Sequence, residues 1–310
     1  MSTCRRIAAA LAPVLVVLTL LVPAAASAQA VMWLSVNGDD TNPCSRPLAC
    51  RTFTGVFSKL PVGGEVHCID SGDFGLLQIN KSMTVDCRAA PAVVRNSNGF
   101  NGVVISLPDA SGGVAIRGLT IDGGNSTASG IRVVNATDVQ IEDVTIRRQG
   151  ASGILVANTA NTWLTVVNVV SRENGQHGVL VAPSAGAVAY VSVSNSVLAA
   201  NHLSGIRAND NAVVVVSDSV LTANYTHNAI AASAAQPTSL TLERVTSSYG
   251  LSGVQAIGAQ ATVYLSNVTT VGNLSSLQPA IGGARYVSFG NNRSAGNTAP
   301  GGTTTPLAQF

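Results

Sequence analysis

A short motif of Gly or Ala, then Ile or Val, then a further apolar residue returns through most of the 310-residue chain. Successive copies lie 23 to 28 residues apart, and the four most alike are Ser129–Val133, Ser152–Val156, His177–Val181 and Ser204–Ala208. The nine copies are marked by Gly75, Gly102, Gly130, Gly153, Gly178, Gly205, Ala229, Gly253 and Ala280. A unit of this length cannot bury its own apolar face, so neighbouring units must stack. The repeat therefore predicts a solenoid.

The segment after each motif indicates that the repeating unit is built of strands. A few turn residues are followed by alternating apolar positions, as in Val139–Glu142, Leu164–Val167 and Tyr190–Val193, which is typical of a strand buried on one face. No segment inside the repeats has a helical period, which excludes the crossover helices of a doubly wound sheet. We therefore expect an all-β fold, a single-stranded parallel β-helix of about nine coils.

Asparagine and aspartate recur at two fixed places in the repeat. Each second strand ends at a bend residue: Asp143, Asn168, Asn195, Asp218, Arg244 or Asn267. A further asparagine precedes many motifs: Asn125, Asn174, Asn201, Asn224 and Asn273. Asn and Asp tolerate left-handed backbone angles, and at a strand spacing of ~4.8 Å their side chains can bond along a ladder. These residues are interpreted as bends rather than as catalytic groups.

The first 30 residues read as a signal peptide. Arg5 and Arg6 precede an apolar stretch from Ala8 to Val22, and small residues around Ala28 suit a cleavage site. The stretch is shorter than the ~20 residues that span a bilayer. The remaining chain divides into a disulfide loop and capping helix (31–64), the β-helix (65–290) and a polar C-terminal tail or cap (291–310). A secreted or periplasmic protein without membrane insertion is predicted.

Four cysteines remain after cleavage, namely Cys44, Cys50, Cys68 and Cys87. In an oxidising compartment an even set indicates two disulfides, for which three pairings are possible. The pairing Cys44–Cys50 with Cys68–Cys87 is favoured, because the second pair lies in successive strand-like segments about one repeat apart. A zinc site is the alternative, but the chain lacks Cys-x-x-Cys. No metal and no cofactor are predicted.

One amphipathic helix is predicted, from Arg51 to Leu60, as a cap over the first coil. Phe53, Val56, Phe57 and Leu60 recur at helical spacing, and Pro61 ends the run.

The charge balance excludes a nucleic-acid partner. The 17 basic residues, less Arg5 and Arg6, leave 15 against 15 acidic residues, whereas nucleic-acid binding needs an excess of phosphate-contacting Lys and Arg.

Through the rung length, the Ser-Gly-Ile-x-Val motif and the asparagine bends, residues 64–291 resemble the right-handed parallel β-helix superfamily with the pectate-lyase-like fold. The chain also resembles exported bacterial proteins that open with Trp-x-Ser-Val-Asn-Gly, here Trp33–Gly38, before a two-cysteine loop and a short helix. The resemblance implies a right-handed coil. It also implies a polysaccharide as the ligand, although some members are scaffolds only.

Catalytic motifs of this superfamily are largely missing. Gln176-His177-Gly178 partly matches the histidine element of polygalacturonases, but the paired aspartates and the Arg-x-Lys element are absent. The acidic calcium cluster of a lyase is not found on adjacent coils either.

The repeat alignment instead predicts a polar surface on the middle coils. Arg147 and Arg172 should stack one coil apart, and the first strands should present a line of Arg132, Leu155, Leu180, Arg207, Ala231 and Gln255. Arginine offers forked donors to planar anions. The candidate ligand-binding residues are Arg132, Arg147, Arg172, Glu173, His177, His202 and Arg207. Trp163 and Tyr225 are possible sugar platforms, on different coils.

These observations favour an exported, non-catalytic binding or structural scaffold for a polysaccharide or cell-surface glycan. The alternative is a polysaccharide-modifying enzyme (lyase, glycoside hydrolase or epimerase) acting on an acidic glycan near His177, Arg147 and Arg172.

Overall fold

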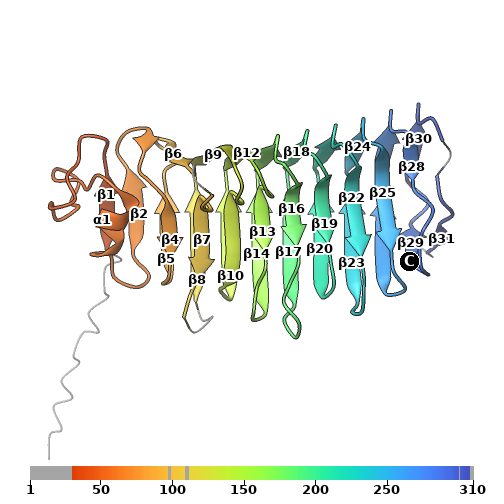
Figure 1. Ribbon diagram of the computed structural model, residues 1–310, viewed down its shortest axis with the longest axis horizontal. Coiled ribbons are helices and arrows are strands. Elements are labelled where there is room, and N and C mark those ends of the chain that lie inside the picture. The colour runs from red at the N-terminus through yellow and green to blue at the C-terminus, as the bar shows by residue number, and fades with distance from the viewer. Residues whose placement is uncertain (1–29, 97–98, 109–111, 300, 308–310) are drawn as a thin grey trace, which may run out of the picture.

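The protein is a right-handed parallel β-helix whose coils stack along one long axis (Figure 1). The structure is a computed structural model that describes residues 30–96, 99–108, 112–299 and 301–307, with the side chains of Asn125 and Ser126 excepted. The predicted signal peptide, residues 1–30, lies almost wholly outside this range. Within it, no helix is long and apolar enough to cross a membrane.

Three parallel sheets form the walls, and the chain visits them in the order A, B, C. The described part of sheet A has twelve strands: β1 (Val31–Leu34), β2 (Glu65–Cys68), β5 (Met83–Asp86), β8 (Gly113–Arg117), β11 (Asp138–Glu142), β14 (Thr162–Val167), β17 (Ala189–Ser194), β20 (Ala212–Ser217), β23 (Thr238–Glu243), β26 (Ala261–Ser266), β29 (Arg285–Ser288) and β31 (Thr305–Pro306).

Among the described residues, sheet B has ten strands: β3 (Gly72–Asp73), β6 (Ala92–Arg95), β9 (Leu119–Ser126), β12 (Thr145–Gln149), β15 (Val170–Arg172), β18 (Val197–Ala199), β21 (Val220–Thr222), β24 (Thr246–Ser248), β27 (Thr269–Val271) and β30 (Arg293–Ala295). Sheet C, in the same range, has nine: β4 (Leu77–Ile79), β7 (Val103–Ser106), β10 (Ile131–Asn135), β13 (Ile154–Val156), β16 (His177–Val181), β19 (Ser204–Ala208), β22 (His227–Ala232), β25 (Ser252–Ile257) and β28 (Ser275–Leu277). Nine successive strands of sheet C are separated by eight turns of the helix.

The repeating motif forms sheet C, and its register corrects three of the nine predicted markers. Ile206 lies opposite Ala229, so Asn228 rather than Ala229 stands level with Gly205. The markers at the two ends, Gly75 and Ala280, are also out of register with their neighbours. The turns between sheets differ in length from coil to coil, so constant spacing places the copies only approximately.

The bend from sheet A to sheet B is a single residue in the left-handed backbone region, as predicted. Its φ is 55° at Asp143, 53° at Asn168 and 49° at Asn195, and Asp218, Arg244 and Asn267 adopt the same conformation. Because left-handed angles are costly for most residues, Asn and Asp suit this position. Their role as bends is confirmed.

A buried ladder of side-chain amides follows the turn from sheet B to sheet C. The Nδ2 of Asn174 donates to Oδ1 of Asn201 at 2.8 Å, and Asn201 donates in the same way to Asn224 at 2.9 Å. Asn273 continues the ladder to Asn297. The predicted ladder is therefore confirmed for these asparagines, whereas the side chain of Asn125 lies outside the described part.

Glycine interrupts the ladder in one coil, and a neighbouring residue bridges the gap. Gly250 takes the place of the asparagine, with its backbone N–H bonded to Oδ1 of Asn273 at 2.9 Å. Asn228 receives a hydrogen bond from Asn224 and donates to Asn273, at 2.9 and 3.0 Å. This bridging role explains why Asn228 replaces the glycine of the motif.

The N-terminal end is closed by the first disulfide loop. The predicted pairs Cys44–Cys50 and Cys68–Cys87 are both present. Backbone bonds from Trp33 N to Cys44 O (2.8 Å) and from Cys50 N to Trp33 O (3.0 Å) lay the loop along β1. The loop thus forms hydrogen bonds with the backbone of β1, an edge strand that could otherwise pair with another chain.

The predicted helix is shorter than expected. It forms one short segment, α1 (Phe53–Phe57), which packs Phe53 against Phe74 and contacts β1 and β4. Ser58 ends the helix, and its hydroxyl bonds to the carbonyl of Gly55, a local bond that competes with helix continuation. Its role as a cap over the first coil stays a prediction.

Candidate functional site

The structure distributes the seven predicted ligand-binding residues over three surfaces. Arg147 and Arg172 lie in register on β12 and β15 of sheet B. Glu173 and His202 lie in the turn from sheet B to sheet C. The remaining three belong to strands of sheet C: Arg132, His177 and Arg207. A single site built from Arg147, Arg172 and His177 is therefore not assembled.

The sheet B arginines form ion pairs with carboxylates of the same surface. Nε of Arg147 and Nε of Arg148 lie 3.2 and 2.9 Å from the carboxylate of Asp122, one coil away, and Arg172 pairs with Glu173. Burial alone would raise the pKa of Asp122, but the bonds from Arg148 and the nearby charges hold that pKa below its usual value. Arg147, Arg148 and Arg172 thus share two carboxylates in a local ion network, so each already has an acidic partner within the protein.

Arg207 is different, because its guanidinium forms no ion pair with any described residue. Its Nε donates to Oδ1 of Asn209 at 2.8 Å. The side chain is half-buried, and burial lowers its pKa, although a guanidinium stays charged in proteins. It lies in register with Leu180 and Ile230 on the neighbouring strands. The predicted line named Ala231 here, which is wrong, because Ile230 stands opposite Arg207 and Ala231 stands opposite Ala208.

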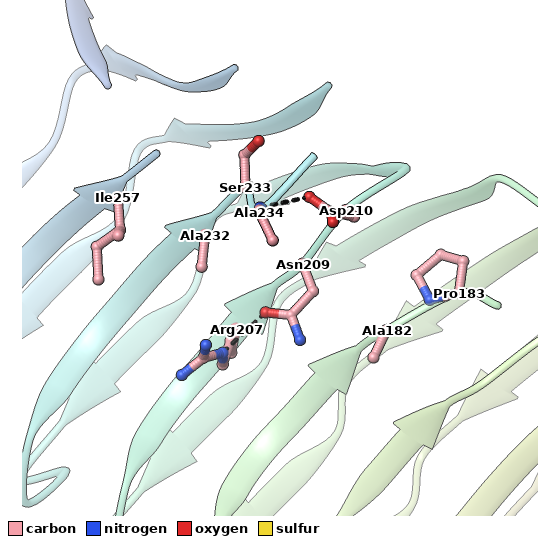
Figure 2. Close-up of a pocket in the computed structure, with 9 residues that line it drawn as sticks. All are labelled: Ala182, Pro183, Arg207, Asn209, Asp210, Ala232, Ser233, Ala234 and Ile257. Atoms are coloured by element: carbon pink, nitrogen blue, oxygen red, sulfur yellow. Dashed lines mark hydrogen bonds between the residues drawn. The ribbon is translucent and has the colours of Figure 1, made fainter. Parts of the chain in front are cut away.

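A pocket of about 430 Å³ opens over Arg207 (Figure 2). Small side chains make the space, and the lining consists of Ala182, Pro183, Arg207, Asn209, Asp210, Ala232, Ser233, Ala234 and Ile257. Figure 2 shows Arg207 and Asn209 side by side on one strand end, with Asp210 turned toward the loop that holds Ala234. The walls therefore come from four successive coils.

Asp210 does not cancel the charge of Arg207. Its carboxylate accepts hydrogen bonds from the backbone N–H groups of Ala234, Ala235 and Gln236, at 2.7 to 3.3 Å. Burial raises the pKa of Asp210, yet these bonds together hold it below its usual value. The carboxylate is thus used to fix the loop that forms one wall. Arg207 and Asp210 carry opposite formal charges, but no ion pair between described residues joins them, so the guanidinium stays available to an anion.

Two histidines lie near Arg207 in sheet C, of which His177 is buried and His227 is partly buried. His177 and His227 stand on either side of Ser204, and the Nδ1 atom of each is buried without a hydrogen-bond partner. Burial, followed by the charges of Arg207 and His227, lowers the pKa of His177 to about 4. Burial and the charge of Arg207 also lower the pKa of His227. Both rings are therefore neutral at pH 7, and the described residues contain no group of three His, Cys, Asp or Glu that would suit a metal.

We expect acid to destabilise the protein between pH 6.5 and pH 4. Unfolded His177 takes up a proton near pH 6.5, whereas the folded residue does so only near pH 4. Stability is therefore full above pH 6.5, falls by about 1.4 kcal/mol per pH unit within this window and then levels off, a total of about 3 kcal/mol. Urea unfolding at pH 7.5, 6.0 and 4.5 measures this loss of stability for the wild type and for His177→Gln. Substitution of the exposed residue His202, as His202→Gln, is the control. Equal slopes for wild type and His177→Gln would contradict the assignment.

Sequence reasoning missed the partners of the two exposed aromatic residues. Trp163 stacks on Tyr190, with ring centroids 5.2 Å apart, and Tyr225 stacks on His202 at 5.3 Å. A signal was present for the first pair, because Trp163 and Tyr190 each occupy the second position of a sheet A strand. Alignment on the strands rather than on the glycines would have found it.

Comparison with known proteins identifies the type of β-helix fold. No protein-family profile matches the sequence, and no curated protein is similar to it. Among solved structures, the pectate lyase Pel9A superposes with a TM-score of 0.58 at 13% identity, over 91% of this chain and 79% of that one. The chain has the pectate-lyase-type β-helix fold. A rhamnogalacturonan lyase shares this β-helix with a TM-score of 0.56 at 11% identity, over 78% of this chain and 74% of its own.

Proposed function

We propose that the protein is an exported, non-catalytic binding scaffold whose Arg207 pocket receives the carboxylate or sulfate group of an acidic polysaccharide or surface glycan. The observation that carries the proposal is the half-buried guanidinium of Arg207, which has no carboxylate partner among the described residues and faces an open pocket. A partly dehydrated guanidinium without a carboxylate partner is a favourable place for an anion, which would form charge-assisted, forked hydrogen bonds with it. Two disulfides are consistent with an extracellular location.

A binding role is favoured over catalysis by the groups around the pocket. Catalysis would need an acid and a base that converge on one substrate position with matched pKa values. His177 is only 5% exposed and a weak base, and the carboxylate of Asp210 is occupied by backbone amides. The second candidate is a polysaccharide lyase, because both fold relatives reported above are lyases by name.

The test is a panel of immobilised polymers followed by product analysis. The panel contains polygalacturonate, alginate, chondroitin sulfate and the uncharged polymer dextran. Binding to at least one of the acidic polymers, weakened by salt and without new reducing ends or unsaturated products, supports the proposal. Products on a bound polymer would establish the enzyme instead. No binding to any acidic polymer, or binding of the acidic polymers that salt does not weaken, would overturn the proposal.

A further inference from the structure

The outer face of sheet A carries an exposed aromatic pair on a different sheet from the Arg207 pocket. Trp163 on β14 and Tyr190 on β17 stand opposite each other, with ring planes only 13° apart. Their side chains are large, yet the residues are 48% and 38% exposed. Two stacked rings left in solvent contribute little to the core, and exposed apolar patches mark binding surfaces.

The three strands β14, β17 and β20 present no charged side chain on this face. The outward positions of β14, β17 and β20, nine in all, are Trp163, Thr165, Val167, Tyr190, Ser192, Ser194, Val213, Val215 and Ser217. Charged side chains begin on the flanking strands. On β11, Asp138 stands opposite Trp163 and Glu142 lies further along, and β23 carries Glu243. Apolar rings beside hydroxyl groups suit a ligand that presents both C–H and O–H groups, as a neutral sugar does.

Two hollows extend the patch along the solenoid. One, of about 270 Å³, lies toward the N-terminus, where Gly113 and Ala115 leave space beside Arg117 and Asp138. The other, of about 370 Å³, lies beyond Val213 and includes Ser239 and Arg285. The register row from Gly113 to Arg285 crosses eight strands, and seven spacings of ~4.8 Å make about 34 Å. An occupant that fills both hollows is therefore long and lies along the axis.

A second protein chain fits this surface less well than a polymer does. Three strand spacings by about six residues give a patch of roughly 14 by 20 Å, or about 300 Å². A stable protein interface buries about 800 Å² on each partner. A thin polymer chain fits better, because it can fill both hollows and contact Trp163 and Tyr190 between them.

We propose that the outer face of sheet A binds a linear, uncharged glycan segment along the solenoid axis, with sugar rings against Trp163 and Tyr190. This site is independent of the acidic-glycan pocket over Arg207. The protein then holds charged and neutral stretches of polysaccharide on two different sheets.

Affinity electrophoresis in gels containing hydroxyethyl cellulose, xylan, galactomannan or dextran tests the proposal. At least one of these neutral polymers should retard the protein. Trp163→Ala and Tyr190→Ala should each weaken that binding about tenfold or more. Tyr249→Ala removes a ring that is 70% exposed on another surface and should leave retardation unchanged, as should Arg207→Ala.

The fluorescence of Trp163 tests directly whether a polymer contacts this ring. The chain has two tryptophans, so Trp33→Phe leaves Trp163 as the sole emitter, and the retarding polymer should shift its fluorescence. No retardation by any neutral polymer, or retardation that survives Trp163→Ala, would overturn the proposal. Self-association in sedimentation that Trp163→Ala abolishes would also overturn it, in favour of a second copy.

Discussion

Replacing Asn224 with alanine is expected to lower the free energy of unfolding by about 4 kcal/mol. The side chain is fully buried in the ladder. Its Nδ2 donates to the carbonyl of Leu198 and to Asn228, and its Oδ1 accepts from the backbone and the side chain of Asn201, all within 3.1 Å. Alanine would leave these groups unsatisfied, and each costs about 1–3 kcal/mol where relaxation or water does not replace the bond.

Urea unfolding followed by circular dichroism measures the effect of Asn224→Ala. Asn195→Gly is the matched control, because Asn195 occupies an exposed bend with a φ of 49° that glycine adopts freely. We expect the control to change stability by less than about 0.5 kcal/mol. A loss below about 1 kcal/mol for Asn224→Ala would mean that the ladder contributes little to stability.

Replacing Arg207 with alanine is expected to weaken binding of acidic polymers about 10- to 100-fold. A hydrogen bond to a charged group contributes about 1.5–3 kcal/mol, and 1.4 kcal/mol corresponds to a factor of ten. Arg207→Lys should retain part of the affinity, because lysine keeps the charge but loses the forked geometry. Calorimetric titration with short oligogalacturonates measures both variants.

Arg293→Ala controls for a general loss of positive charge in the Arg207 experiment. Arg293 is exposed on β30 of sheet B, away from the pocket, and its loss should leave the affinity unchanged. Equal weakening by Arg293→Ala and Arg207→Ala would show that binding follows net charge rather than the pocket.

The solenoid was predictable because its determinants are local. Alternating apolar positions specify strands, and one bend residue such as Asn168 specifies each corner, so a few neighbouring residues carry the information. Exact register was not predictable in the same way. Asn228 replaces a motif glycine only because Gly250 leaves a gap in the next coil, and such compensation is visible only when both coils are superposed.

The candidate site was predictable in part, for a related reason. Arg207 was found from its place in the repeat, and the stacking of Arg147 on Arg172 was also correct. The pairing of Arg147 and Arg148 with Asp122 was not foreseen, since that carboxylate lies on a strand that carries no comparable bend or motif signal. Likewise the loop that Asp210 anchors depends on backbone N–H groups, which a comparison of side chains does not reveal.

The central claim is that an anionic sugar group binds the guanidinium of Arg207, which has no carboxylate partner among the described residues. A crystal structure of the protein with hexagalacturonate tests it most directly. The account predicts a carboxylate within about 3 Å of the Arg207 guanidinium, in the pocket walled by Ala182 and Ala234. An oligosaccharide bound elsewhere, or an empty pocket at a saturating concentration of the ligand, would contradict it.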